Sequence, residues 1–108
     1  MAATFTLTGA QATGNGLMMV VGTFVLDNSY ATGGEVLDLS TYFVSTTTPV
    51  IIPHAISATY GYRSDQGTAS GNKIVAYVLA DGTEAGSSSN LSAVVGNVVA
   101  YGIQAGSA

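Results

Sequence analysis

One histidine and six acidic residues are the first candidates in this sequence for acid–base or hydrolytic catalysis. A histidine that acts as a general base needs a nucleophile and an orienting carboxylate beside it. His54 follows Pro53 in an extended segment, a setting more typical of a structural histidine. The acidic residues stand mostly in turn contexts, where carboxylates accept backbone N–H groups, and they are Asp27, Glu35, Asp38, Asp65, Asp81 and Glu84. We therefore predict that the protein is not an enzyme and has no catalytic residue.

The clearest oxygen-ligand motif is Asp81-Gly82-Thr83-Glu84, which could hold a cation weakly but lacks the spacing of an EF-hand loop. The chain has no cysteine, so it can form neither a disulfide nor a thiolate metal site. Gly14-Asn15-Gly16 and Thr32-Gly33-Gly34 have neither the lysine of a phosphate-binding loop nor the spacing of a dinucleotide fingerprint. They are typical of turns whose backbone has positive φ. We predict no metal site and no cofactor.

Charge is scarce in this chain: 7% of the residues are charged, against about 25% in ordinary soluble proteins. Only Arg63 and Lys73 are positive and the net charge is −4, so the chain lacks the basic cluster that binds nucleic acid or an anionic membrane. The longest apolar stretch, residues 17–26, is shorter than the about 20 residues of a membrane-spanning helix. A surface so poor in charge resists association weakly, and we predict that a partner or further copies of the chain cover much of it.

Alternating apolar and polar residues predict short β-strands separated by glycine-rich turns. The predicted strands are, in order, 4–8, 17–27, 50–52, 56–63, 73–80 and 91–103, with a turn at 9–16 and a candidate bulge at Gly96. Residues 17–27 are apolar on both sides, which predicts burial on both sides, in a core and against a neighbour. Residues 36–43 fit either one helical turn or an irregular strand. Pro49 and Pro53 bracket 50–52, which is therefore predicted to be an edge strand or a short extended segment, because proline cannot donate a backbone hydrogen bond.

No segment keeps a helical amphipathic spacing for more than two turns, and glycines recur between the predicted strands. This pattern predicts an all-β fold, either an antiparallel β-sandwich or a small β-barrel. The length fits a single domain over residues 1–108, with residues 1–3 and 104–108 expected to be flexible.

Six tyrosines are spread along the chain. Tyrosine is enriched both in protein interfaces and in β-strands, and the sequence leaves these two roles open for Tyr30, Tyr42 and Tyr101. The fourth and fifth predicted strands are expected to form a hairpin. Tyr60 and Tyr62 stand two positions apart on one face of that hairpin, and we predict that both lie in the core.

Three groups of motifs, in this order along the chain, are similar to those of a known family. They are Val20-Val21-Gly22-Thr23-Phe24 leading into Ser29-Tyr30-Ala31-Thr32-Gly33-Gly34-Glu35; Gly61-Tyr62-Arg63 with Lys73-Ile74-Val75-Ala76-Tyr77; and Gly82-Thr83-Glu84 followed by Asn90-Leu91-Ser92-Ala93-Val94-Val95 and Val98-Val99-Ala100-Tyr101-Gly102. In these motifs the chain resembles the capsid decoration, or cement, proteins of tailed bacteriophages. The similarity extends over residues 17–103, and residues 46–54 depart from the family's pattern.

The resemblance implies a structural virion protein on the outer surface of an icosahedral phage head, assembled in the host cytoplasm. It would bind the major capsid protein and hold neighbouring capsomers together at a symmetry axis, as a homodimer or homotrimer of the chain. Such a protein stabilises the shell because it binds assembled capsid and not separated capsomers. The resemblance implies no catalytic residue, and neither nucleic acid nor membrane as a partner.

Loops and strand ends carry the contacts of many β-sandwiches, so we expect capsid or partner contacts in the loop 30–35 and in apolar terminal pieces. The expected contact residues are Tyr30, Thr32, Gly33, Gly34, Glu35, Tyr42 and Tyr101. Three other functions stay open: a tail, fibre or collar subunit of a phage, a carbohydrate-binding β-sandwich, and a small hydrolase with His54 as its base. The absence of tryptophan counts against the carbohydrate-binding module, which needs an aromatic platform.

Overall fold

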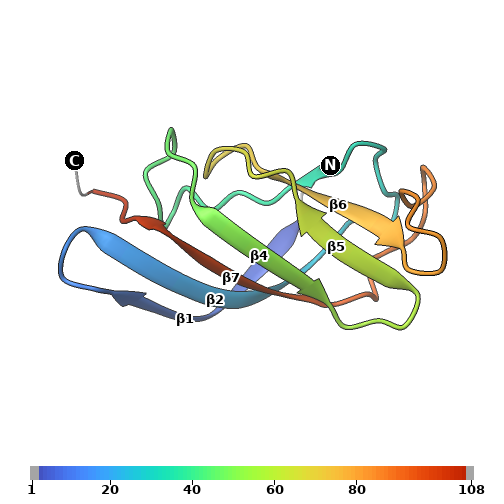
Figure 1. Cartoon of the computed structure of the whole chain (residues 1–108), viewed down its shortest axis with the longest axis horizontal. Helices are drawn as coiled ribbons and strands as arrows, with labels where there is room; N and C mark the ends of the chain where they lie inside the picture. The colour runs from blue at the N-terminus through green and yellow to red at the C-terminus, as the bar shows by residue number, and fades with distance from the viewer. Residues whose placement is uncertain (1–2, 107–108) are drawn as a thin grey trace.

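The computed structural model describes residues 3–106 of the 108-residue chain, and these residues form seven β-strands and no helix (Figure 1). The strands are β1 (Thr4–Ala12), β2 (Leu17–Val25), β3 (Glu35–Val36), β4 (Val50–Ala55), β5 (Tyr60–Ser64), β6 (Lys73–Val78) and β7 (Gly96–Ile103). They belong to two sheets, with the orders β1-β2-β7-β4 and β3-β6-β5, and every pairing is antiparallel. The predicted all-β fold is confirmed: the sheets form a sandwich and not a closed barrel.

The two sheets pack through side chains that alternate along β2. Val20 and Phe24 point into the core, where Phe24 is 2% exposed and its ring centroid lies 5.1 Å from that of Tyr62 on β5. The residues that alternate with them, Met19, Val21 and Thr23, face the opposite way, and Met19 is 42% exposed. Burial in the core is therefore confirmed for one side of residues 17–27. The other apolar side of β2 belongs to the outward face of its sheet, so its predicted burial against a neighbour would need another chain and stays a prediction.

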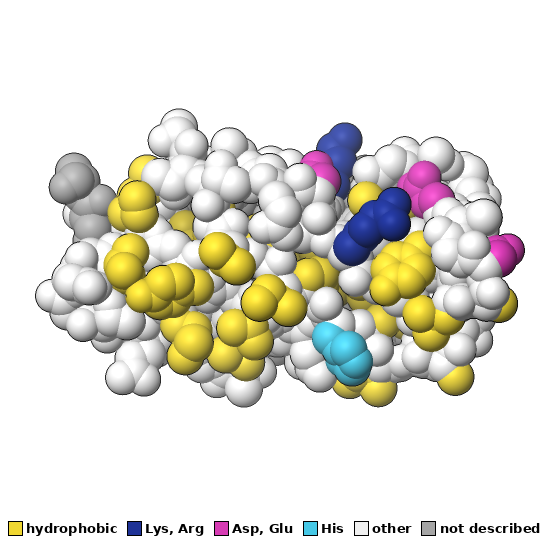
Figure 2. Space-filling view, viewed as in Figure 1, with side chains coloured by type: hydrophobic (Ala, Val, Ile, Leu, Met, Phe, Trp, Pro, Cys, Tyr) yellow, Lys and Arg dark blue, Asp and Glu magenta, His cyan; other side chains and the backbone are white. Residues whose placement is uncertain are grey.

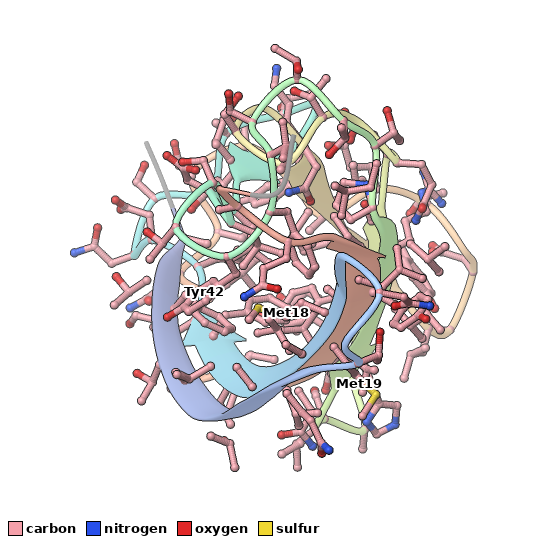
Figure 3. All side chains as sticks on the ribbon, turned by 90° about the vertical axis from the view of Figure 1, so that its left-hand side faces the viewer. Met18, Met19 and Tyr42 are labelled. Carbon is pink, nitrogen blue, oxygen red and sulfur yellow. The ribbon has the colours of Figure 1, made fainter. Side chains whose placement is uncertain are left out.

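The hairpin of β1 and β2 curls strongly, with Met18 on its concave side and Met19 on its convex side (Figure 3). The Phe5 ring lies on the concave side, directly over Gly22 of β2, where a Cβ atom would come 2.5 Å from the ring. Phe5 also packs edge-on against Tyr42, with ring centroids 5.9 Å apart. The missing side chain at Gly22 thus lets an aromatic ring hold the curled strand against the rest of the chain.

β1 is longer than its alternation pattern indicates. The register to β2 shifts between Leu7 and Gly9, so that one extra residue forms a bulge, and pairing resumes from Gly9 to Ala12. The turn predicted at 9–16 is therefore wrong in its first half, and only residues 13–16 connect the two strands. The glycine that suggested a turn marks the bulge instead.

The edge strand predicted at 50–52 is confirmed as β4, which pairs only with β7, but it is longer than predicted because it continues through Pro53 to Ala55. The predicted hairpin is confirmed as the pair β5 and β6. It begins at Tyr60, because the preceding residues form a turn in which Ile56 is 57% exposed. Tyr62 is buried and Tyr60 packs against the core, as predicted.

Residues 36–43 were predicted to form either one helical turn or an irregular strand, and the structure contains features of both. After the short strand β3, the Phe43 N–H donates to the carbonyl oxygen of Leu39 at 3.1 Å, which is the hydrogen bond of one helical turn. Phe43 then forms an isolated β-bridge with Gln104. The segment therefore folds as one turn followed by an irregular extended residue.

The last strand is shorter than predicted, because β7 begins at Gly96 and residues 91–95 lie outside it. The ends of the described chain form backbone hydrogen bonds, and the expected flexibility of residues 3 and 104–106 stays a prediction. The Ala3 N–H lies 2.8 Å from a carbonyl oxygen of β3, and the Gln104 N–H lies 2.8 Å from that of Gly16. Residues 1–2 and 107–108, also expected to be flexible, lie outside the described residues.

The Gly22→Ala substitution is expected to destabilise the fold by roughly 1–3 kcal/mol, because the new methyl group would overlap both the Phe5 ring and the Thr6 carbonyl oxygen, 2.6 Å away. The shift of the urea unfolding midpoint measures this cost. Gly9→Ala is the matched control in the same strand pair, since a Cβ at Gly9 meets nothing within 4 Å. Equal midpoints for the two variants would contradict the packing described for Phe5.

Candidate partner-binding surface

The outward face of the β1-β2-β7-β4 sheet is apolar over three adjacent strands. The register places six apolar residues in two rows across β2, β7 and β4, namely Met19, Tyr101 and Val50 in one row and Val21, Val99 and Ile52 in the next. Figure 2 shows these hydrophobic side chains gathered in one area of the surface, apart from the positive side chains. None of the four strands of this sheet contains a lysine, arginine, aspartate or glutamate.

The exposure of this face is high for large apolar side chains. Ile52 is 60% exposed, Val50 55% and Tyr101 41%. A contiguous exposed apolar patch marks a site of association more often than it marks bare surface. We name these six residues and Ile103, which follows in β7 and is also exposed, the apolar face.

A shallow groove of ≈ 280 Å³ continues the apolar face toward β1. It is lined by Thr8, Gly9, Ala10, Gln11, Met19 and Val21. The groove lies where β1 bulges, and Gly9 brings no side chain to fill the space in front of Val21. The surface is thus hollowed beside its apolar centre, which suits a protruding side chain of a partner.

Two of the residues that were expected to contact a partner are buried, and that expectation is wrong for them. Tyr30 is 1% exposed, and its hydroxyl group donates to Glu84 Oε2 at 2.8 Å and accepts from the Ala76 N–H at 3.1 Å. Glu35 is 0% exposed, and its Oε1 accepts from the Asp27 N–H at 2.8 Å. Both side chains therefore organise the interior of the fold and are out of reach of a partner.

The rest of the predicted contact loop forms a tethered turn. The Gly33 N–H donates to Glu84 Oε2 at 2.6 Å, and both Gly33 and Gly34 have positive φ, which glycine adopts without strain. A Cβ atom at Gly34 would lie 2.9 Å from the Ile74 carbonyl oxygen, so this residue is pressed against β6. Thr32 and Gly33 are exposed, and they are the part of the loop 30–35 that a partner can reach.

The last two expected contact residues have different surroundings. Tyr42 is half-buried, because its ring packs on Phe5. Tyr101 lies in the apolar face, between Met19 on one side and Val50 on the other. The structure thus brings Tyr101 together with an apolar patch and keeps it apart from the loop around Thr32, which leads into β3 of the other sheet. The contacts themselves stay predictions.

Glu84 accepts hydrogen bonds from a segment more than fifty positions away in the sequence. The Gly33 N–H and the Tyr30 hydroxyl both donate to its carboxylate and lower the pKa of Glu84 below its usual value of 4.5. Burial, together with the hydrogen bond to that carboxylate, raises the pKa of Tyr30 to about 12. The hydrogen-bonded pair of Tyr30 and Glu84 connects the loop before β3 to the segment after β6, so we assign it a structural role.

A smaller hollow of ≈ 180 Å³ lies where β4 and β5 run side by side. Its lining consists of Pro53, His54, Ala55, Ser57, Tyr60, Gly61, Tyr62, Tyr77 and Leu79. The Tyr77 ring lies over Gly61, and the Arg63 guanidinium lies 5.7 Å from the centre of that ring. His54 and Ser57 share this hollow, but none of the lining residues is a carboxylate that could orient the imidazole.

Across residues 3–106 no three histidine, cysteine or acidic side chains come together in a group that could hold a metal ion. The two carboxylates of the sequence motif 81–84 bond to different groups instead of turning toward a common point. The Asp81 Oδ1 accepts from the Thr83 N–H and hydroxyl group, while Glu84 points to Gly33 and Tyr30. Each carboxylate thus serves its own turn.

Comparison with known proteins finds no relative: no family model, no curated protein and no solved structure matches this chain. The part of the chain that the structure describes contains no helix long and apolar enough to cross a membrane.

Apart from Tyr101, the residues of the apolar face were not among the contact residues expected from the sequence, although their pattern is visible there. Met19 and Val21 alternate with buried residues in β2, and Val99, Tyr101 and Ile103 do the same in β7. That pattern was interpreted as a strand covered on both sides. The pattern is the same for an outward apolar face, and only the arrangement of the second sheet decides between them.

Tyr30→Phe removes one hydroxyl group and is expected to lower the free energy of unfolding by about 1–3 kcal/mol, because the buried Ala76 N–H loses its acceptor. Chemical denaturation measures the change. Tyr101→Phe is the matched control, since Tyr101 is 41% exposed, and it should shift stability by less than about 0.5 kcal/mol. A Tyr30→Phe protein as stable as wild type would refute the structural role of this hydroxyl group.

Acid is expected to weaken the tie between Glu84 and the loop. Because the folded-state pKa of Glu84 lies below its usual 4.5, its contribution is complete above the unfolded-state pKa and is lost as pH falls through the folded-state pKa. Unfolding midpoints at neutral pH and at about pH 3 should therefore differ less for Glu84→Gln than for wild type. If the variant loses as much stability in acid as wild type does, the acid sensitivity arises at other groups.

Proposed function

We propose that this chain is a structural virion protein, a capsid decoration protein that binds the outside of an icosahedral phage head and stabilises contacts between capsomers. The observation that carries the proposal is the apolar face on a sheet whose four strands contain no charged residue. The motif resemblance along residues 17–103 names the family, and the apolar face supplies a surface suited to its task. The partner is the major capsid protein, and the location is the outer surface of the capsid.

The physical basis is burial of apolar surface. A fully buried valine, leucine or isoleucine side chain contributes about 1.5–3 kcal/mol relative to an exposed one. Each side chain of the apolar face is already partly covered, so one copy gains only a fraction of this on docking, and association itself costs at least about 4 kcal/mol. Modest attachment suffices for a cement protein, because binding to assembled capsid alone shifts the assembly equilibrium by mass action, and the effect adds over many copies.

Two other functions share part of this support. A tail or collar subunit of a phage would also present a charge-free apolar face, and the copy number per particle separates it from a decoration protein. A carbohydrate-binding β-sandwich would use the hollow beside Tyr60, Tyr77 and His54. That hollow of ≈ 180 Å³ is smaller than most ligand pockets, whose volumes begin at about 300 Å³, so it supports carbohydrate binding less well.

Quantitative mass spectrometry of purified virus particles tests the location. A decoration protein is expected in a simple ratio to the major capsid protein, such as one to one, one half or one third. A handful of copies per particle would place the chain in the tail or collar. Complete absence from particles would overturn the virion proposal.

Ile52→Lys is expected to weaken binding to undecorated capsids at least about tenfold, because the apolar face would then have to bury a charge. Cosedimentation with purified capsids measures the affinity. Ala80→Lys, in the exposed turn after β6, adds the same charge elsewhere and should bind as wild type does. Thr32→Lys tests the loop in the same assay. Loss of binding in Thr32→Lys but not in Ile52→Lys would move the contact to the loop.

A further inference from the structure

The two sheets have four edge strands, and three of them are protected. β4 includes Pro53, lies beside β5, and its Ile51 carbonyl oxygen accepts from the Gln66 side chain at 2.9 Å, so β4 and β5 shield one another. β3 has two residues, and the Ala3 N–H already donates to it. β1 is the remaining edge, and it runs for nine residues along the outside of the hairpin.

The backbone groups on the free side of β1 follow from the hydrogen-bond alternation of an antiparallel ladder. The Thr13 N–H donates to the Leu17 carbonyl oxygen, so the groups of Ala12 and Ala10 point away from β2. On the other side of the bulge the Ala3 N–H points toward β3, which places the groups of Phe5 and Leu7 on the same free side. Between Phe5 and Ala12 these outward groups have no hydrogen-bond partner within residues 3–106.

Natural proteins protect a long edge strand with lysine, proline, a covering loop or very short length, because an unpaired edge pairs with another strand. β1 contains no charged residue and no proline, and eight of its nine residues are exposed. The bulge between Leu7 and Gly9 is its one protective feature. The segments on either side of the bulge are left open for pairing.

We propose that β1 is a dimerisation edge, where the β1 strands of two copies of this chain pair antiparallel about a two-fold axis and join their four-stranded sheets. A second copy fits this edge because it presents a strand of the same length, and because neither strand carries a charge that would repel the other. Leu7 is 43% exposed on the concave side, beside Ala10 and Ala12. Pairing places these apolar side chains next to those of the other copy.

The dimer does not rest on the proposed function. The apolar face and the edge of β1 are different surfaces, and self-association is measured on the isolated protein, whereas capsid binding is measured with capsids. Antiparallel pairing of one edge with itself closes after two copies. The inference therefore selects a homodimer and excludes a homotrimer built on this edge.

Ala10→Pro tests the edge without removing a bond inside the chain. The outward Ala10 N–H is unused within the described chain, so proline blocks pairing with a second copy while β1 keeps its bonds to β2. Ala12→Lys is a second blocking variant that keeps the backbone unchanged and places on the edge the lysine with which natural proteins prevent strand pairing. Ala80→Lys adds a charge far from β1 and serves as the control.

Sedimentation velocity over a range of concentrations is expected to show a dimer for wild type and for Ala80→Lys, and a monomer for both blocking variants. Wild type that stays monomeric up to about 1 mM would overturn the proposal. Dimers that survive in both blocking variants would also overturn it. So would a dimer that Ile52→Lys dissociates and the blocking variants do not, because the apolar face would then be the interface.

Hydrogen exchange measured residue by residue gives a readout that a general loss of stability does not imitate. In wild type the amides of Phe5, Leu7, Ala10 and Ala12 should exchange more slowly as concentration rises. The amides of the intervening residues, which bond to β2, should not change. Fast exchange of the outward amides at every concentration would contradict pairing through β1.

Discussion

The packing of Phe24 is the interaction on which the arrangement of the two sheets depends. Its ring is almost fully buried, lies over Gly96 of β7 and is tilted against Tyr62 of β5. A Cβ atom at Gly96 would come 2.5 Å from the ring, so the glycine makes room for the aromatic side chain. The Tyr62 hydroxyl group in turn donates to the Val94 carbonyl oxygen at 2.9 Å, which fixes the segment leading into β7. One side chain of β2 thus sets the spacing of the two sheets where they pack together, near the end of β2 and the start of β7.

The sheets that meet at this point are unequal, and the exposed surfaces follow from that inequality. The strands of the larger sheet have six to nine residues each, while those of the smaller sheet have two to six. The smaller sheet covers one face of the larger one near Phe24 and leaves the hairpin end of β1 and β2 projecting (Figure 1). All eight residues with a formal charge lie in the smaller sheet and in the loops, where several of the carboxylates accept backbone N–H groups of turns. The larger sheet is left without charge on its outward face and along its edge.

Local patterns in the sequence were sufficient to predict most of the strands but not the residues of the candidate partner-binding surface. Alternation identified β2 and the hairpin of β5 and β6, and Pro53 identified an edge strand. The burial of Tyr30 could not be predicted from local patterns, because its hydrogen-bond partners Glu84 and Ala76 are 54 and 46 positions away in the sequence. A Tyr-x-Thr-Gly-Gly-Glu segment has the composition of an exposed loop, and only the folded chain brings its first and last residues inside. The apolar face was hidden for the opposite reason, since an apolar strand side has the same pattern whether protein or water lies against it.

The edge of β1 and the apolar face belong to the same sheet, so pairing at the edge would also fix how the apolar faces of two copies lie relative to each other. Strands that pair across a two-fold axis continue one sheet, so the outward faces of both copies would lie on the same side of the joined sheet. The groove beside Gly9 would then stand near the axis, between two apolar faces. A surface of this kind presents two equivalent patches at a fixed spacing, and two linked contacts bind a lattice of repeating subunits far more tightly than one. Exposed apolar side chains that gain little singly would in that way gain enough together for the proposed attachment to a regular shell.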